Sequence, residues 1–205
     1  MPFTDAPITI ALVVANIALS FVAFQSEAFM RRNLFVVGPI LQDGQYHRMV
    51  TSGFLHLNIL HLVVNMYVLY EFGPTVEHIL GSATFAALYA VSLVGGSAWS
   101  LLENRRHPRY SAVGASGATS GVVFVFCLFL PNETLGLFFA IPMPAWFLAI
   151  GYFAVSAYFS TRPNTRIGHD AHLGGMLFGG GFVFFLYPGL WTHFMTAVST
   201  SLGTS

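Results

Sequence analysis

Six long apolar stretches divide this 205-residue sequence, and their number and length decide what the chain can fold into. A helix that crosses the hydrocarbon core of a bilayer needs about 20 predominantly apolar residues. Candidate spans of this kind run approximately over Pro7–Phe24, Leu55–Phe72, Ser82–Leu102, Ala112–Leu130, Met143–Phe159 and Ala171–Pro188. Helix breakers such as Gly73-Pro74 fall at or near the gaps, and the runs lack the alternation of a membrane strand. We therefore predict an all-α bundle of six membrane helices, forming one domain over residues 1–205 with both termini on one side.

The composition agrees with a membrane protein and excludes several other classes. Charged residues make up only 8% of the chain and hydrophobic residues 55%, whereas soluble domains carry roughly 25% charged residues. The net charge is zero and lysine is absent, so the chain lacks the basic field that holds nucleic acid. The single cysteine, Cys127, excludes an intramolecular disulfide and a cysteine-based zinc cluster. The expected surroundings are the lipid bilayer, and nucleic acid is excluded as a partner.

The connections between the spans are unequal in length and in charge. The first, Gln25–Phe54, is long enough that we expect it to contain short structure of its own. All arginines lie in the first, third and fifth connections, which share one face of the membrane. They are Arg31, Arg32, Arg48, Arg105, Arg106, Arg109, Arg162 and Arg166. The positive-inside rule places that face in the cytoplasm and both termini outside.

Three polar groups stand near the starts of the second, fourth and sixth spans. His61 and Asn65 are four residues apart and share one helix face. The fourth span opens with Gly114-Ala115-Ser116-Gly117, and the sixth with His169-Asp170-Ala171-His172. Polar residues inside a bilayer are costly, and function is the usual reason for them. Because these three spans start from the same face, the polar groups are expected to lie at similar depth.

A serine, a histidine and an amide donor at one depth are the parts of a nucleophilic acyl-transfer site. His172 can take the proton of Ser116 and return it to a leaving amine. Two strips of small residues, Gly117-xxx-Gly121 and Gly175-xxx-Gly179, allow the fourth and sixth helices to approach closely. If these strips face each other, Ser116 and His172 come within hydrogen-bond reach.

Taken singly, these residues have plainer interpretations. Ser116 alone suits helix packing, and Asn65 alone suits a hydrogen bond between helices. Asp170 lies two residues before His172 and points to another side of a helix, so no carboxylate is evident as a third catalytic member.

A transport or binding protein is the alternative from a different class. In that interpretation His56 with His61, and His169 with His172, hold a metal ion or carry protons. Against it, His56 and His61 diverge on a helix, and the HExxH motif of metalloproteases is missing. We expect neither a metal nor a cofactor.

In their order along the chain, these motifs resemble those of the rhomboid family of intramembrane serine proteases. The matching segments are Tyr46-His47-Arg48, Phe54-Leu55-His56, His61-xxx-Asn65, Glu71-Phe72-Gly73, Val76-Glu77-His78-xx-Gly81, Gly114-Ala115-Ser116-Gly117 and Ala171-His172-Leu173-Gly174-Gly175. The resemblance implies a rhomboid-like six-helix fold and an endopeptidase that cleaves in or next to transmembrane segments of other membrane proteins. It also implies that substrates enter from the side, beside the fifth helix, and that water is the second substrate.

The resemblance further assigns roles by position. The nucleophile is Ser116, the general base is His172, the oxyanion hole consists of Asn65, His61 and the Ser116 backbone N–H, and the turn is shaped by Gly114 and Gly117. Structural roles are implied for Arg48, which ties the first loop together, and for Glu77. A non-catalytic rhomboid-like protein that binds transmembrane clients is the alternative, but such proteins lose the serine or the histidine.

Two features depart from the family pattern. An aromatic residue often follows the serine by four positions and stacks on the histidine, but this position is Ser120 here. We therefore expect His172 to pack against Phe124 or against a residue from another helix. Rhomboids usually keep the N-terminus in the cytoplasm, opposite to the orientation that the arginines predict. The expected location is a plasma or inner membrane. The sequence does not determine which side of the membrane the site faces, which substrate it takes or which oligomeric state the protein has.

Overall fold

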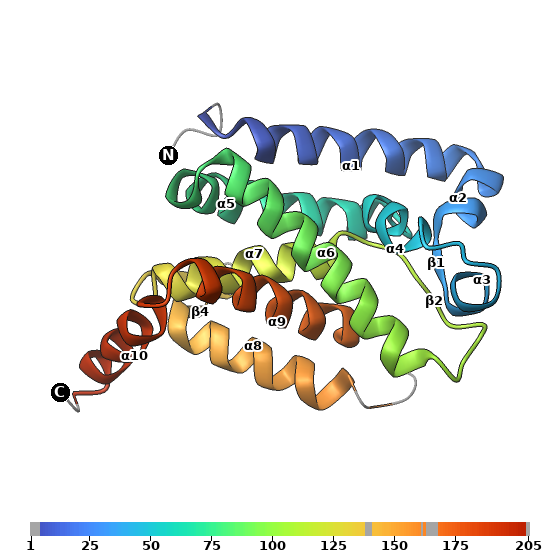
Figure 1. The fold of residues 1–205 in the computed structure, drawn as a ribbon. Coiled ribbons are helices and arrows are strands. Elements are labelled where there is room, and N and C mark those ends of the chain that lie inside the picture. The colour runs from blue at the N-terminus through green and yellow to red at the C-terminus, as the bar shows by residue number, and fades with distance from the viewer. Residues whose placement is uncertain (1–4, 138–140, 161, 163–167, 204–205) are drawn as a thin grey trace.

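A computed structural model describes residues 5–137, 141–160, 162 and 168–203, and these fold into a bundle of helices (Figure 1). Its main helices are α1 (Pro7–Gln25), α5 (Ile59–Leu80), α6 (Ser82–Asn104), α7 (Ser116–Phe129), α8 (Ala145–Ser160) and α9 (His169–Leu186). At one edge α1 packs on α5, in the centre α6, α7 and α9 pack on one another, and α8 covers α9 at the opposite edge. The predicted all-helical class is confirmed.

Among the described residues, three helices are long and apolar enough to cross a membrane, namely α1, α5 and α6. The 18-residue helix α9 meets the combined criteria of length and apolar character only together with α10 (Leu190–Ser201), from which it is bent by 108°. The 14 residues of α7 rise about 21 Å, less than the hydrocarbon core of about 30 Å. In Figure 1 the chain after β2 (Ser111–Ala112) runs into the bundle before α7 begins. The first residue of α7 therefore lies inside the bundle.

The helix α5 extends beyond the end predicted at Phe72. It continues through Gly73 and Pro74 to Leu80, although a proline inside a helix removes one backbone hydrogen bond. Membrane helices tolerate this loss. At this point α1 crosses α5 so closely that a Cβ on Gly73 would lie 2.7 Å from Cγ2 of Thr9. The Gly73-Pro74 pair, expected near a gap between spans, marks a helix crossing.

A buried carboxylate joins the start of α1 to α5 and α6. Glu77 is only 3% exposed and accepts hydrogen bonds from the backbone N–H groups of Ile8 (3.0 Å) and Thr9 (2.8 Å). The hydroxyls of Thr9 (2.8 Å) and Ser82 (2.7 Å) donate to it as well. The N–H groups in the first turn of a helix have no partner within that helix. Glu77 satisfies two of them in α1.

The long connection Gln25–Phe54 contains the short structure expected of it. It forms α2 (Glu27–Asn33), β1 (Phe35–Val36), α3 (Val37–Gln42), α4 (Arg48–Thr51) and η2 (Ser52–Phe54). The buried Arg48 guanidinium donates to the carbonyls of Arg31 (2.9 Å) and Leu34 (2.8 Å). Strand β1 pairs antiparallel with β2, placing Phe35 opposite Ala112. The loop is therefore fixed to the segment that leads into α7.

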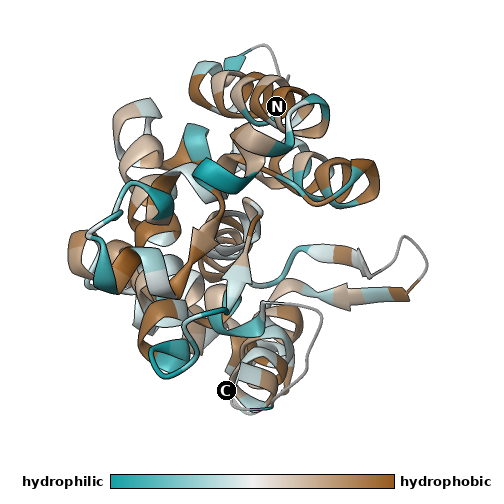
Figure 2. Cartoon of the chain, turned by 90° about the vertical axis from the view of Figure 1, so that its right-hand side faces the viewer, coloured by the Kyte–Doolittle hydropathy of each residue, from teal (hydrophilic) through white to brown (hydrophobic). Residues whose placement is uncertain are grey.

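A second pair of strands lies between α7 and α8. Strand β3 (Thr134–Leu137) pairs antiparallel with β4 (Ile141–Pro144). The view from the end of the bundle shows this hairpin projecting sideways, and it shows hydrophilic residues mainly in segments that connect helices (Figure 2). The arginines of these connections include Arg166, which lies outside the described residues.

We expect Glu77→Ala to destabilise the bundle, because it leaves buried donors of α1 and Ser82 without an acceptor. Loss of hydrogen bonds to a charged group predicts a decrease of about 2 kcal/mol or more in the free energy of unfolding. Thermal or denaturant unfolding in detergent micelles measures it. Glu71→Ala, at an exposed position of the same helix, is the matched control. Equal stability of the two variants would contradict the role given to Glu77.

Candidate active site

A glycine turn presents Ser116 at the start of α7. Gly114 has a φ of +132°, a conformation that residues with a Cβ rarely adopt. A Cβ at this position would lie 2.6 Å from Cε1 of His61 and 3.7 Å from Oγ of Ser116. The side chains of His61 and Ser116 therefore both lie next to the space that a Gly114 side chain would occupy. Since Ser116 is the first residue of α7, its backbone N–H belongs to the unpaired N–H groups of a helix start.

The two glycine strips of α7 and α9 lie against each other. A Cβ on Gly175 would lie only 1.9 Å from the carbonyl oxygen of Gly117. A Cβ on Gly179 would lie 3.4 Å from the Cα of Gly121. Backbone thus meets backbone at this crossing, and at position 175 only glycine has room.

The same crossing brings the serine and histidine candidates to one place. A Cβ on Gly117 would lie 3.2 Å from the carbonyl oxygen of Ala171, and one on Gly96 of α6 would lie 2.7 Å from it. Ser116 directly precedes Gly117 in the chain, and His172 directly follows Ala171. Ser116 and His172 are therefore each next in sequence to a residue of this contact between α7 and α9.

Asn65 is held in one orientation by two hydrogen bonds. Its side chain is 4% exposed, and its Nδ2 donates to the carbonyl of His61 (2.9 Å). Its Oδ1 accepts from Oγ1 of Thr119 (3.2 Å), a hydroxyl whose one hydrogen is shared with the carbonyl of Ser116 (3.3 Å). Thr119 was not anticipated from the sequence. The sequence feature that could have identified it is its spacing from Ser116, because residues three apart lie on the same side of a helix. Because Thr119 bonds to Oδ1, the Nδ2 group of Asn65 points away from Thr119.

The ring contact of His172 comes from another helix. The ring centroids of Tyr152, on α8, and His172 are 6.0 Å apart at 54°. Of the two neighbours expected for His172, Phe124 instead makes a ring contact with Phe153 (6.1 Å). Ser120, at the position where the family often has an aromatic residue, is buried.

Asp170 anchors the start of α9 to α6. Its buried Oδ2 accepts hydrogen bonds from Ser100 (2.6 Å), Asn104 (2.7 Å) and the hydroxyl of Tyr110 (2.9 Å). Burial and the nearby carboxylate raise the pKa of Tyr110, so its hydroxyl remains a donor at neutral pH. Asp170 points away from His172, as its position predicted. Within the described part of the chain, Nδ1 of His172 has no hydrogen-bond partner.

The two histidine pairs have neighbours of their own. The expectation that His56 and His61 diverge on one helix is wrong, because α5 begins only at Ile59 and the two rings are 5.0 Å apart. Nδ1 of His56 lies 2.8 Å from the hydroxyl of Ser20 on α1. The rings of His169 and His172 are 5.9 Å apart. Over residues 5–137, 141–160, 162 and 168–203, no group of three or more His, Cys, Asp or Glu is placed to hold a metal ion.

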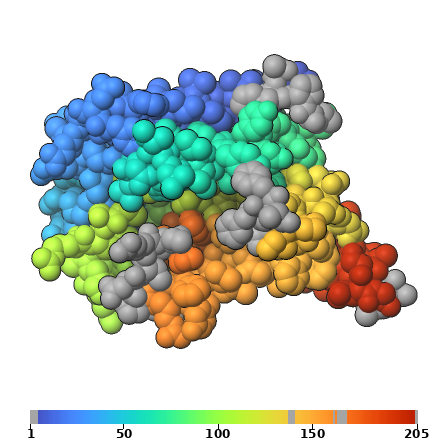
Figure 3. Space-filling view, turned by 180° about the vertical axis from the view of Figure 1, so that it is seen from behind, coloured from blue at the N-terminus to red at the C-terminus, as the bar shows by residue number. Residues whose placement is uncertain are grey.

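The candidate site is partly open. Ser116, His61 and His172 are half-buried, whereas Asn65 and Thr119 behind them are buried. Seen from behind, α5 and α8 lie on either side of the middle of the molecule, and part of α9 is visible between them (Figure 3). The three candidate reacting side chains are thus accessible in part, while the two supporting side chains are enclosed.

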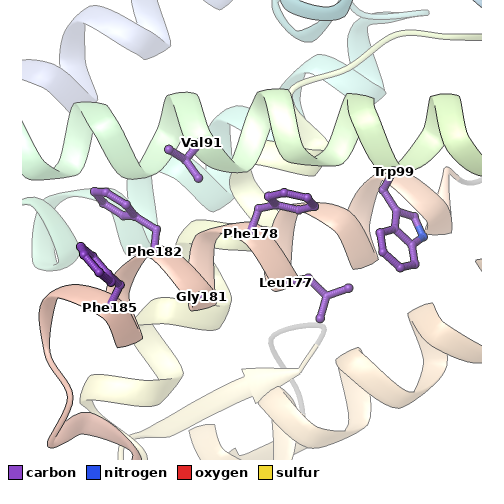
Figure 4. Close-up of a pocket in the computed structure, with 7 residues that line it drawn as sticks. All are labelled: Val91, Trp99, Leu177, Phe178, Gly181, Phe182 and Phe185. Carbon is purple, nitrogen blue, oxygen red and sulfur yellow. The ribbon is translucent and has the colours of Figure 1, made fainter.

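A separate hollow of about 490 Å³ lies between α6 and α9. Its lining includes Val91 and Trp99 of α6 with Leu177, Phe178 and Phe182 of α9 (Figure 4). These side chains are apolar or aromatic, and neither serine nor histidine is among them. This surface suits contact with lipid chains and has no groups for acyl transfer.

Comparison with known proteins agrees with this geometry. The sequence model of the Rhomboid domain matches residues 43–189, which contain every candidate site residue. The chain belongs to the rhomboid family. As a rhomboid-family chain with several apolar helices, it is a multi-pass integral membrane protein.

Individual relatives support the same assignment. RHOMBOID-like protein 12, mitochondrial, of Arabidopsis thaliana is 31% identical over 84% of this chain and 56% of its own length. Presenilin-associated rhomboid-like protein, mitochondrial, of Mus musculus is 30% identical over 93% of this chain and 52% of its length. Rhomboid protein 1, mitochondrial, of Saccharomyces cerevisiae is 33% identical over 63% of this chain and 39% of its own length. The matches span about half or less of each relative's length.

Gly175→Ala is expected to separate α7 from α9, because the new methyl group would collide with the Gly117 carbonyl. Overpacking of this kind predicts a loss of about 3 kcal/mol in the free energy of unfolding. Gly181→Ala is the matched control on the same helix, since a Cβ there meets nothing within 4 Å. Its effect should stay below about 1 kcal/mol. Unfolding in detergent compares them, and a Gly175→Ala protein as stable as the control would refute the close crossing.

Proposed function

We propose that this rhomboid protein is an intramembrane serine endopeptidase that cleaves transmembrane segments of other membrane proteins with a Ser116/His172 dyad. The observation that carries the proposal is the crossing of α7 and α9, where Ser116 and His172 flank the contact of Gly117 with Ala171. The half-open position of Ser116 inside the bundle supports cleavage within or next to a membrane segment.

In the first half of the reaction, Oγ of Ser116 attacks the scissile carbonyl carbon while His172 takes the hydroxyl proton. The tetrahedral intermediate collapses, the C–N bond breaks, and His172 gives that proton to the leaving amine. In the second half, water attacks the carbonyl carbon of the acyl-serine and His172 takes a proton from the water. The second tetrahedral intermediate then collapses, the bond between this carbon and Oγ of Ser116 breaks, His172 returns the proton to Oγ, and the carboxyl product leaves. No metal or cofactor takes part in these steps.

The negative oxygen of each tetrahedral intermediate needs donors that are already in place. The backbone N–H of Ser116 supplies one, at the positive end of the α7 dipole. The Nδ2 group of Asn65 supplies a second, because only one of its two hydrogens is used by the His61 carbonyl. His61 lies beside Gly114 and the Ser116 hydroxyl, which supports a role for its ring as a third donor.

The substrate and compartment follow from the family and its members. Substrates are proposed to be single-span or multi-span membrane proteins that enter from the bilayer beside α8. The three relatives compared above are named as mitochondrial proteins. We therefore propose a mitochondrial inner membrane as the location, in place of the plasma or inner membrane expected from the sequence alone.

Cleavage of a fluorescently tagged single-span substrate in liposomes tests the proposal. We expect Ser116→Ala and His172→Ala each to abolish turnover without unfolding the bundle. Asn65→Ala should retain some activity, because loss of one oxyanion donor costs about 10² to 10³ in kcat.

Two results would contradict the proposal. One is a Ser116→Ala protein that still cleaves. The other is a wild-type protein that binds several single-span substrates without cleaving any, which would favour the non-catalytic, client-binding alternative. An Asn65→Ala protein as inactive as Ser116→Ala would contradict the division of roles. Melting temperature and elution volume of each variant control for folding.

A further inference from the structure

A hydroxyl chain connects α8 to the nucleophile. Oγ of Ser120 donates to the backbone carbonyl of Ser116 (2.6 Å) and also lies 2.6 Å from the hydroxyl of Tyr152. A serine hydroxyl has one hydrogen, which the carbonyl takes, so Tyr152 is the donor in the second bond. The chain thus runs from Tyr152 through Ser120 to the backbone of Ser116.

The ring of the same tyrosine contacts the histidine. Tyr152 and Phe159 are seven residues apart and lie on one face of α8. The Tyr152 ring lies 6.0 Å from that of His172, and the Phe159 ring is stacked on that of His169 at 5.2 Å. The face of α8 that carries these rings therefore packs along the start of α9. Of the two rings, that of Tyr152 also belongs to the hydroxyl chain to α7.

The imidazole of His172 needs such support. In a triad, a carboxylate orients the histidine through Nδ1, but Asp170 is occupied by Ser100, Asn104 and Tyr110. Among described residues, none bonds to Nδ1 of His172. Contact with a neighbouring ring is then the means by which the imidazole is held.

We propose that Tyr152 is a positioning residue that holds both members of the dyad, His172 through its ring and Ser116 through Ser120. This inference rests on the proposed function. Tyr152 provides, from α8, the ring contact to His172 that an aromatic residue of α7 often provides in the family. In this chain that position of α7 is Ser120. The dyad is therefore assembled only while α8 lies against α7 and α9.

The test compares Tyr152→Leu, which removes ring and hydroxyl, with Tyr152→Phe, which removes the hydroxyl alone. The readouts are kcat and KM for the liposome substrate, and the rate at which a fluorophosphonate probe labels Ser116. A misplaced catalytic group costs about 10² in rate, so Tyr152→Leu should lose about that factor in kcat and in labelling. KM should change less than about threefold, and Tyr152→Phe should lose about fivefold, as expected for one hydrogen bond.

Probe labelling separates positioning from substrate entry, because the small probe does not need a transmembrane segment to pass α8. Tyr158→Leu, at an outward position of α8 that is 56% exposed, is the control and should label at the wild-type rate. If Tyr152→Leu does not fold, Tyr152→Phe carries the test. The double variant with Ser120→Tyr and Tyr152→Ser moves the ring to α7 and should label at least about tenfold faster than Tyr152→Ser alone.

Wild-type rates in a folded Tyr152→Leu protein would overturn the inference, and so would a defect confined to KM. A wild-type protein that neither cleaves nor labels would instead overturn the proposed function. The two failures are therefore distinguishable.

Discussion

The site depends on the direct contact of two helix backbones. Where α7 crosses α9, a Cβ on Gly175 would lie 1.9 Å from the Gly117 carbonyl, so the helices approach more closely than any side chain permits. In a bilayer, apolar side chains gain little by leaving lipid, and small residues instead allow helices to pack by close contact. This crossing sets Gly117, the residue after Ser116, beside Ala171, the residue before His172. Without it the helices that carry the two candidate catalytic groups would not meet at this point.

Around that crossing, anchors fix the starts of α1 and α9 and the segment that leads into α7. Asp170 holds α9 to α6, and the β1–β2 pairing holds the loop to the segment that leads into α7. Glu77 holds the start of α1 to α5 by accepting hydrogen bonds from two backbone N–H groups of α1. In each case a buried polar group or strand satisfies backbone or side-chain donors that lipid could not. The bundle can therefore keep a short helix, α7, that begins inside the protein.

Local patterns in the sequence were sufficient for the helical class and for the candidate residues. The four-residue spacing of His61 and Asn65, and of the glycines, is a property of a single helix that can be read directly. Contacts made between distant segments have no such signal. Tyr152 lies in an apolar run where a tyrosine has no distinguishing spacing, and Thr119 gains meaning only when α5 is beside α7. The continuation of α5 through Pro74 likewise depends on α1, which packs there.

The central claim is that Ser116, His172 and the oxyanion donors form one reacting centre. The most direct measurement is an experimental structure of the protein after reaction with a fluorophosphonate. The proposed function predicts a covalent bond to Oγ of Ser116, with Nε2 of His172 facing that oxygen. It also predicts a phosphoryl oxygen about 2.7–3.1 Å from the Ser116 backbone nitrogen and from Nδ2 of Asn65. An unmodified Ser116, or an adduct whose oxygen points away from Asn65, would contradict it.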